Sequence, residues 1–152
     1  HRVVDGAPWA GRTTNGRRII RYLHNDSTMN INLYKACHVN HPSTIWVRQS
    51  KQNYDWLYDM WIHVCNEYTH RYGRVHASMV KLEEILVLAP DRIGDGEFTE
   101  PTLAMKQYPN CVVKGDAVES YRNFYWEDKR GFAKWTNRPE PSWWQERELL
   151  NG

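Results

Sequence analysis

The sequence predicts a mainly α fold: a single compact helical domain with long irregular connections. Three observations favour this fold class. The chain has 152 residues, which is enough for one domain with a buried core. Apolar residues in the middle of the chain recur at helical spacing, at steps of i, i+3, i+4 and i+7. No segment alternates convincingly between apolar and polar residues with the period of two that indicates a half-buried strand.

Residues 1–40 are predicted to form a basic, turn-rich N-terminal arm. Glycine, proline and asparagine are frequent, periodicity is weak, and one short ordered piece is expected at Arg17–Leu23. Residues 1–25 carry five arginines and a single acidic residue, Asp5, although the whole chain has a formal net charge of only +2. Such an arm is typical of contact with a phosphate backbone, and equally of a solvated, partly disordered segment.

Residues 41–138 are predicted to form a helical core domain. A helix begins near Pro42, because proline is tolerated in a first turn, with Asn40 or His41 at its cap. The apolar stripe that follows comprises Tyr54, Leu57, Tyr58, Trp61, Ile62, Cys65 and Tyr68. Its spacing is that of an amphipathic helix, and Gly73 is the natural stop.

Two further helices are expected, over Ala77–Leu88 and from Asp116 to about Lys129. In the second of these, the predicted inward side chains are Val118, Tyr121 and Tyr125. Residues 89–115, between the two helices, are rich in proline and glycine and form a long connection, which usually indicates either a function or a lack of order. Residues 139–152 form a C-terminal tail.

The three cysteines have no paired spacing, which argues for a reduced, intracellular compartment and against a disulfide framework. No apolar run reaches the length of a membrane span, and no secretory leader is present, so no membrane partner is expected.

The histidines raise the question of a metal site. His63, Glu67 and His70 lie on one helical face, and the last two have the Glu-x-x-His spacing of di-iron bundles. Such bundles need a second Glu-x-x-His, and the sequence has none. We therefore predict satisfied surface or interface histidines, no metal site and no cofactor.

Basic residues interleaved with aromatic residues form the remaining candidate site. Their alternation suits a groove that follows a nucleic-acid backbone and stacks exposed bases, although an ordinary solvated helix face is the default interpretation. The predicted nucleic-acid-binding residues are Arg48, Lys51, Asn53, Lys134 and Arg138, with His41 and Trp135 as further candidates.

Several segments, taken in order, resemble a family of small proteins of tailed phages and large DNA viruses. They are "HVNHPSTIWVRQSKQNYDWLYDMW", "NEYTHRYGRVH", "FTEPTLAM", "GDAVESYRNFYW" and "FAKWTNR", which together cover roughly residues 38–138. More loosely, the Asn40-His41 start of a long aromatic and basic helix resembles the phage pyrimidine-dimer DNA glycosylases of the endonuclease V type.

The glycosylase resemblance implies a specific chemistry. In such enzymes an N-terminal amine attacks the sugar C1′ to form a Schiff base, and a nearby glutamate supports the β-elimination. The resemblance also implies a further segment before "HRVVDG", so no residue here is matched to the amine or the glutamate, and the catalytic residues stay unassigned.

The expected function is therefore that of a viral DNA-associated protein with a glycosylase/lyase-like scaffold, acting on damaged or modified bases in DNA repair. The expected location is the host cytoplasm or the virion. The main alternative is a non-catalytic virion or accessory protein whose aromatic residues anchor an interface with other viral proteins. A metalloenzyme built on Glu67 and His70 and an enzyme that modifies free nucleotides are weaker alternatives.

Overall fold

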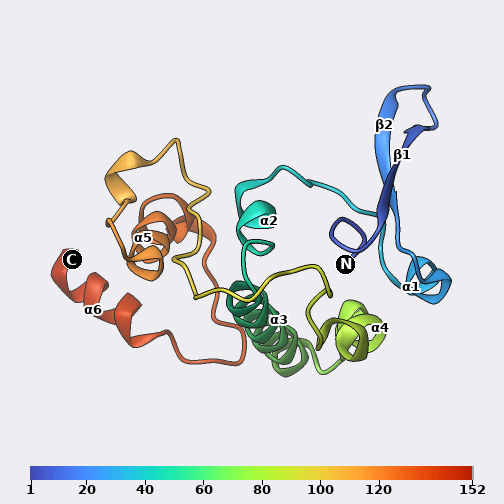
Figure 1. The fold of residues 1–152 in the computed structure, drawn as a ribbon. Helices are drawn as coiled ribbons and strands as arrows, with labels where there is room; N and C mark the ends of the chain where they lie inside the picture. Colours follow the sequence, from blue (N-terminus) through green and yellow to red (C-terminus); the bar gives the residue numbers. More distant parts are fainter. Residues whose placement is uncertain (152) are drawn as a thin grey trace.

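The computed structural model describes residues 1–151, and for the last of these only the backbone. The order of elements is β1 (Ala7–Arg12), β2 (Arg18–Leu23), α1 (Ser27–Asn32), α2 (Pro42–Trp46), α3 (Lys51–Tyr72), α4 (Ala77–Leu86), η1 (Pro109–Cys111), α5 (Ala117–Phe124), η2 (Tyr125–Lys129), η3 (Arg130–Phe132) and α6 (Ser142–Asn151). Helices are thus the most frequent elements, and β1 and β2 pair as one antiparallel sheet. In Figure 1, α3 lies at the centre, the hairpin of β1 and β2 projects on one side, and α5 and α6 lie on the other.

The predicted long helix is interrupted, because a second cap starts a new helix inside it. His41 caps α2 as expected, with its Nδ1 accepting a hydrogen bond from the Ser43 amide. Ser50 then has an extended backbone, and its Oγ accepts from the Asn53 amide at 3.2 Å, which starts α3. Gly73 ends α3 in the left-handed conformation, with φ of 65°, so the predicted stop is confirmed.

The apolar stripe of α3 is only partly buried. Cys65 is 3% exposed, but Leu57 and Trp61 are half-buried. An amphipathic stripe of this kind usually faces the core, but of these three side chains only Cys65 is buried. The large buried side chains come instead from short helices and turns on either side of α3: Trp46 from α2, Trp126 from η2 and Trp144 from α6.

The N-terminal segment is more ordered than a basic arm. Residues 7–23 form a β-hairpin, and its second strand, Arg18–Leu23, coincides with the short ordered piece expected at Arg17–Leu23. These strands show no alternation in the sequence because no residue of either strand is buried, so no face needs a continuous row of apolar residues. The period of two that marks a half-buried strand is therefore missing from their sequence.

In the C-terminal part, the helix starts where the sequence predicted, but the side chains that face inward differ from the predicted ones. Asp116 caps α5 by accepting from the Glu119 amide at 2.8 Å. Val118 and Tyr125 are 57% and 49% exposed, so their predicted inward position is wrong. Ala117 and Ser120 face inward instead. Their small size allows close packing, and the Ser120 hydroxyl accepts from the Val113 amide.

The predicted tail contains a helix, α6, that the sequence interpretation missed. Its Trp144 is 3% exposed and packs edge-on against Trp126, with ring centroids 5.1 Å apart. The proline-rich start of the tail masked this helix, because prolines Pro139 and Pro141 precede its first residue rather than interrupt it.

Candidate nucleic-acid interface

The hairpin forms because its turn sequence suits a three-residue loop. The Thr13 amide donates to the Arg17 carbonyl at 2.9 Å, which closes the loop formed by residues 14–16. Gly16 has φ of +82°, a conformation that glycine adopts without strain. The Thr13 Oγ1 accepts from the Arg17 amide at 3.0 Å, and Arg12 donates to the Gly16 carbonyl. The asparagine–glycine pair that indicated a turn in the sequence therefore makes the hairpin tip.

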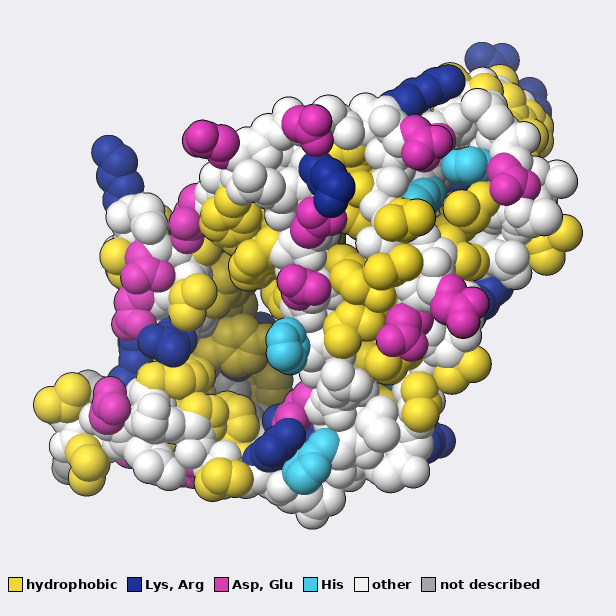
Figure 2. Space-filling view, turned by 60° about the horizontal axis from the view of Figure 1, so that its bottom comes forward, with side chains coloured by type: hydrophobic (Ala, Val, Ile, Leu, Met, Phe, Trp, Pro, Cys, Tyr) yellow, Lys and Arg dark blue, Asp and Glu magenta, His cyan; other side chains and the backbone are white. Residues whose placement is uncertain are grey.

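Positive charge is concentrated on this hairpin. Residues 6–23 contain four arginines and no acidic residue. Arg12 pairs with Arg18 across the strands, so both side chains lie on one face, whereas Arg21 pairs with Trp9 and lies on the other. Figure 2 shows Lys and Arg side chains at the end of the molecule where the hairpin projects, next to hydrophobic atoms. Both faces of the hairpin thus carry cationic groups.

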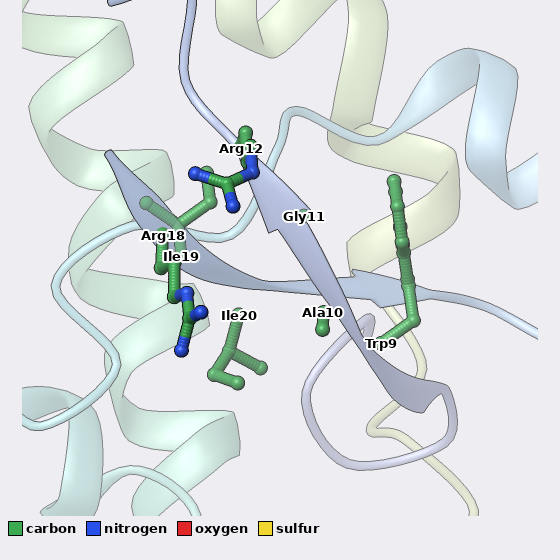
Figure 3. A pocket seen from close by; sticks show the side chains of 7 residues that line it. All are labelled: Trp9, Ala10, Gly11, Arg12, Arg18, Ile19 and Ile20. Atoms are coloured by element: carbon green, nitrogen blue, oxygen red, sulfur yellow. The ribbon is translucent and has the colours of Figure 1, made fainter. Parts of the chain in front are cut away.

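Apolar side chains are exposed between these arginines. Trp9 is 48% and Ile20 59% exposed, and they help to line an open surface pocket of about 640 Å³. Figure 3 shows Trp9 at one end of this group and the two arginines, Arg12 and Arg18, near the turn. The indole lies over Gly11, because a Cβ built there would be 3.5 Å from the ring. The hairpin therefore offers a flat aromatic surface as well as charge.

The base of the hairpin is fixed to the rest of the fold. Arg2 is 9% exposed, and its guanidinium donates to the carbonyls of Tyr22, Asn30 and Leu33 at 3.2, 2.6 and 2.9 Å. Gly6 allows close backbone approach, since a Cβ there would lie 2.3 Å from the Arg2 carbonyl oxygen. The projecting arginines are thus carried on a rigid base.

The structure separates the basic residues that the sequence had grouped together. Lys51 begins α3, whereas Arg138 forms an ion pair of 2.9 Å with Glu67, sixteen residues further along the helix. Sixteen residues correspond to about 24 Å of helix and to about 160° of rotation. Arg48 precedes α3 and donates to the Val39 carbonyl at 2.8 Å, whereas the Lys134 carbonyl accepts from Arg71 near the far end of α3. The four basic groups therefore do not make one continuous groove.

Asn53 has no polar atom left for a ligand. It is 0% exposed, and its amide nitrogen donates to the Trp46 carbonyl at 3.1 Å and to Thr99 Oγ1 at 2.9 Å. Its Oδ1 accepts from the Thr99 amide at 2.9 Å. The prediction that Asn53 contacts nucleic acid is wrong because this side chain fixes the connection between α4 and α5 against α3.

The two other candidates have structural roles. His41 caps α2 and remains exposed. Trp135 is half-buried and packs on Trp144, with ring centroids 5.3 Å apart at 73°. Its ring is thus engaged in the aromatic cluster of the C-terminal part rather than presented for stacking on a base.

The histidine face of α3 is likewise occupied by protein partners. Glu67 accepts from Arg71 at 2.8 Å and from Arg138 at 3.0 Å, and these two hydrogen bonds lower the pKa of its carboxyl group. His70 Nε2 lies 2.7 Å from the Asn137 carbonyl oxygen. These contacts join α3 to residues 134–138, and both carboxylate oxygens of Glu67 are hydrogen-bonded to guanidinium groups.

A second polar cluster, which the sequence interpretation missed, lies at the base of the hairpin. His1, Asp5 and His24 each offer a ligand atom, and these atoms all lie within 4.8 Å of one another. Tyr54 of α3 joins the cluster through a 3.0 Å contact with His1 Nε2, and burial raises the pKa of its hydroxyl. No motif spacing links residues 1, 5, 24 and 54, so only the fold reveals the cluster.

Comparison with protein-family models, curated protein sequences and solved structures finds no match to this chain. Within residues 1–151, none of the helices combines the length and the apolar composition that a membrane crossing requires.

Proposed function

We propose that this chain is a nucleic-acid-binding protein with a mainly α scaffold that contacts the phosphate backbone through its β1–β2 hairpin. The observation that carries this proposal is the projecting hairpin, with four arginines and no acidic residue between Gly6 and Leu23. In line with the sequence resemblance, we propose viral DNA with damaged or modified bases as the substrate, and a scaffold of the pyrimidine-dimer glycosylase/lyase type.

The charge distribution supports an anionic partner. The chain as a whole has a net charge of only +2, so its attraction to a polyanion depends on local concentration of charge. Arg12, Arg17 and Arg18 are exposed at the tip, where no carboxylate of the hairpin competes for them. Arginine binds phosphate through paired N–H groups, which suits this partner.

The shape of the hairpin supports a duplex. The major groove of B-form DNA admits a two-stranded β-ribbon, and a ribbon with cations on both faces has groups for both walls of the groove. An isolated hairpin with two exposed faces has marginal stability in water. Contact with a groove would cover Trp9 and Ile20, which are otherwise exposed.

Equilibrium binding to a fluorescently labelled duplex, measured by anisotropy over a range of salt concentrations, tests the proposal. Each phosphate contact contributes about 0.9 to the slope of log K against log salt. The double variant Arg17→Ala with Arg18→Ala should therefore lower the slope by about 2. Within residues 1–151, the side chains of Arg17 and Arg18 make no hydrogen bond or ion pair, so the hairpin itself should stay folded.

The matched control is Lys51→Ala with Lys134→Ala, which removes the same charge from the surface that the sequence had indicated. For this control, the slope of log K against log salt should change by less than half of the change expected for the arginine variant. If the control variant instead loses the larger part of the slope, or if the wild-type chain shows no binding at low salt, the hairpin is not the interface.

A specific observation also favours the alternative, a non-catalytic accessory protein. Trp56, Met60 and Val64 follow one another at steps of four along α3 and are 37%, 42% and 60% exposed. Figure 2 shows a hollow lined by hydrophobic side chains between α3 and the C-terminal part. Exposed apolar stripes of this kind often mark protein interfaces. Self-association that Met60→Glu abolishes, together with no DNA binding, would favour this function.

A further inference from the structure

The cluster at the base of the hairpin is built from side chains of residues 1–5 and of His24, with Tyr54 of α3 beside them. The side chains of His1, Asp5 and His24 are 6%, 12% and 11% exposed. Asp5 also accepts from the amides of Asp91 and Arg92, at 3.2 and 3.0 Å, so its carboxylate is held in place from the connection that follows α4. Such burial needs a cation or well-formed hydrogen bonds to balance the carboxylate.

The distances within the cluster are too long for hydrogen bonds. Asp5 Oδ2 lies 4.0 Å from His1 Nδ1 and 3.7 Å from His24 Nε2, whereas an N–H···O bond spans roughly 2.7–3.2 Å. Nitrogen and oxygen ligands around one zinc ion, each about 2.0–2.2 Å from it, are spaced roughly 3.3–3.6 Å apart. The two separations from Asp5 Oδ2, 4.0 and 3.7 Å, are therefore closer to the spacing of a ligand shell than to that of a hydrogen-bonded pair.

The hydrogen bonds around His1 leave one of its nitrogens free for a cation. Tyr54 has a single hydroxyl hydrogen, and it donates this to the Leu86 carbonyl at 2.9 Å. The Tyr54 oxygen must then accept the hydrogen bond from His1 Nε2, 3.0 Å away. In the neutral ring, the lone pair on His1 Nδ1 therefore faces the Asp5 carboxylate, and these two acceptors repel one another unless a proton or a metal ion lies between them. A hydrogen bond to the other ring nitrogen is also the usual support of a metal-bound histidine.

We propose that His1 Nδ1, Asp5 Oδ2 and His24 Nε2 bind a divalent transition-metal ion, of which Zn²⁺ is the probe. Two imidazole nitrogens and one carboxylate oxygen form a donor set that suits zinc, iron or cobalt better than calcium or magnesium. Two ligands precede β1 and the third follows β2, so a bound ion fastens the two ends of the hairpin to each other. This inference does not depend on the proposed DNA binding.

Binding changes the protonation of His24. Its Nδ1 now accepts from the Asp26 amide at 3.0 Å, so the proton of the neutral ring is on Nε2. Coordination through Nε2 moves this proton to Nδ1, and the Asp26 amide loses its acceptor. The amide signal of Asp26 and the ring nitrogen signals of His24 therefore report directly on the site.

The test is titration of the metal-stripped 152-residue chain with zinc chloride, followed by calorimetry and nitrogen NMR. We expect one equivalent to bind, the Asp26 amide and His24 ring signals to move together, and the melting temperature to rise. His24→Gln and Asp5→Asn should each weaken binding at least tenfold. His63→Gln, which alters an exposed histidine of α3 outside the cluster, should bind as the wild type does.

Far-ultraviolet circular dichroism shows whether each variant is folded, and His24→Gln serves if Asp5→Asn is not. Absence of saturable binding would overturn the proposal. Binding that survives His24→Gln, or that leaves the Asp26 amide unchanged, would also overturn it.

Discussion

Asn53 shows how a single buried polar residue determines the course of a long connection. Its side chain bonds both to α2, at the Trp46 carbonyl, and to Thr99, in the segment after α4. Trp46 also donates its indole N–H to the Thr99 carbonyl at 3.1 Å. An otherwise irregular segment is therefore fixed at Thr99 by hydrogen bonds to two buried side chains, Asn53 and Trp46.

We expect Asn53→Ala to lower the free energy of unfolding by about 1–3 kcal/mol for each buried group left without a partner. The Thr99 amide is the group that loses its partner, because the Trp46 carbonyl keeps its 3.1 Å hydrogen bond from the Gln49 amide, so urea denaturation should give a loss of roughly 1–3 kcal/mol. Gln52→Ala is the matched control, because Gln52 accepts from the Phe98 amide on the same segment but is exposed. Equal losses in the two variants would show that burial is not the cause.

At the scale of the element, the hairpin depends on a backbone contact that only glycine permits. A Cβ at Gly6 would lie 2.3 Å from the Arg2 carbonyl oxygen and 2.4 Å from that of Leu23. Both are main-chain atoms, so they cannot move away as a flexible side chain would. The contact closes the base from which both strands extend.

Gly6→Ala should therefore destabilise the base of the hairpin by about 1–3 kcal/mol, the usual cost of forcing an extra methyl group into a packed site. Hydrogen exchange should show faster exchange of the amides of β1 and β2 than in the wild type. Gly94→Ala is the control, since nothing lies within 4 Å of a Cβ at that position. Unchanged protection of the strands in Gly6→Ala would contradict this role.

The elements differ in how far the sequence predicts them. The body and the end of α3 are predictable because its apolar spacing and Gly73 agree with one another, but its start at Lys51 is not, because the pattern predicted one helix from near Pro42. The hairpin is not, because both of its faces are exposed and its strands lack alternation. The same holds for the candidate site. The sequence shows that the N-terminal segment is basic, but only the structure shows that its arginines are concentrated on a hairpin.

At the scale of the whole molecule, Glu67 joins the central helix to the C-terminal part. It accepts hydrogen bonds from Arg71 within α3 and from Arg138 beyond η3, and these lower the pKa of its carboxyl group. A carboxylate whose pKa is lower in the folded than in the unfolded chain stabilises the fold when the pH is above its unfolded-state pKa. This stabilisation is lost as the pH falls through its folded-state pKa. The stabilisation is thus complete at neutral pH and is lost in acid.

We therefore expect Glu67→Gln to melt at a lower temperature than the wild type at pH 7, and the difference to shrink below a pH of about 4. Glu84→Gln, which removes the same charge from an exposed position on α4, is the control. A Glu67→Gln difference that stays constant from pH 7 to pH 3 would show that the ion pairs do not join the two parts.

The contact of Asp5 with Asp91 and Arg92 has a consequence for the order in which the chain folds. The partners are 86 and 87 residues apart, so the two backbone amides meet this carboxylate only after the intervening segments have been made. Closing so long a loop is entropically costly, and contacts of large sequence separation slow folding. During synthesis, the N-terminal turn must therefore wait for more than half of the chain to leave the ribosome before it can dock. Until then the arginines of the hairpin belong to a nascent segment that is not yet docked on residues 91–92.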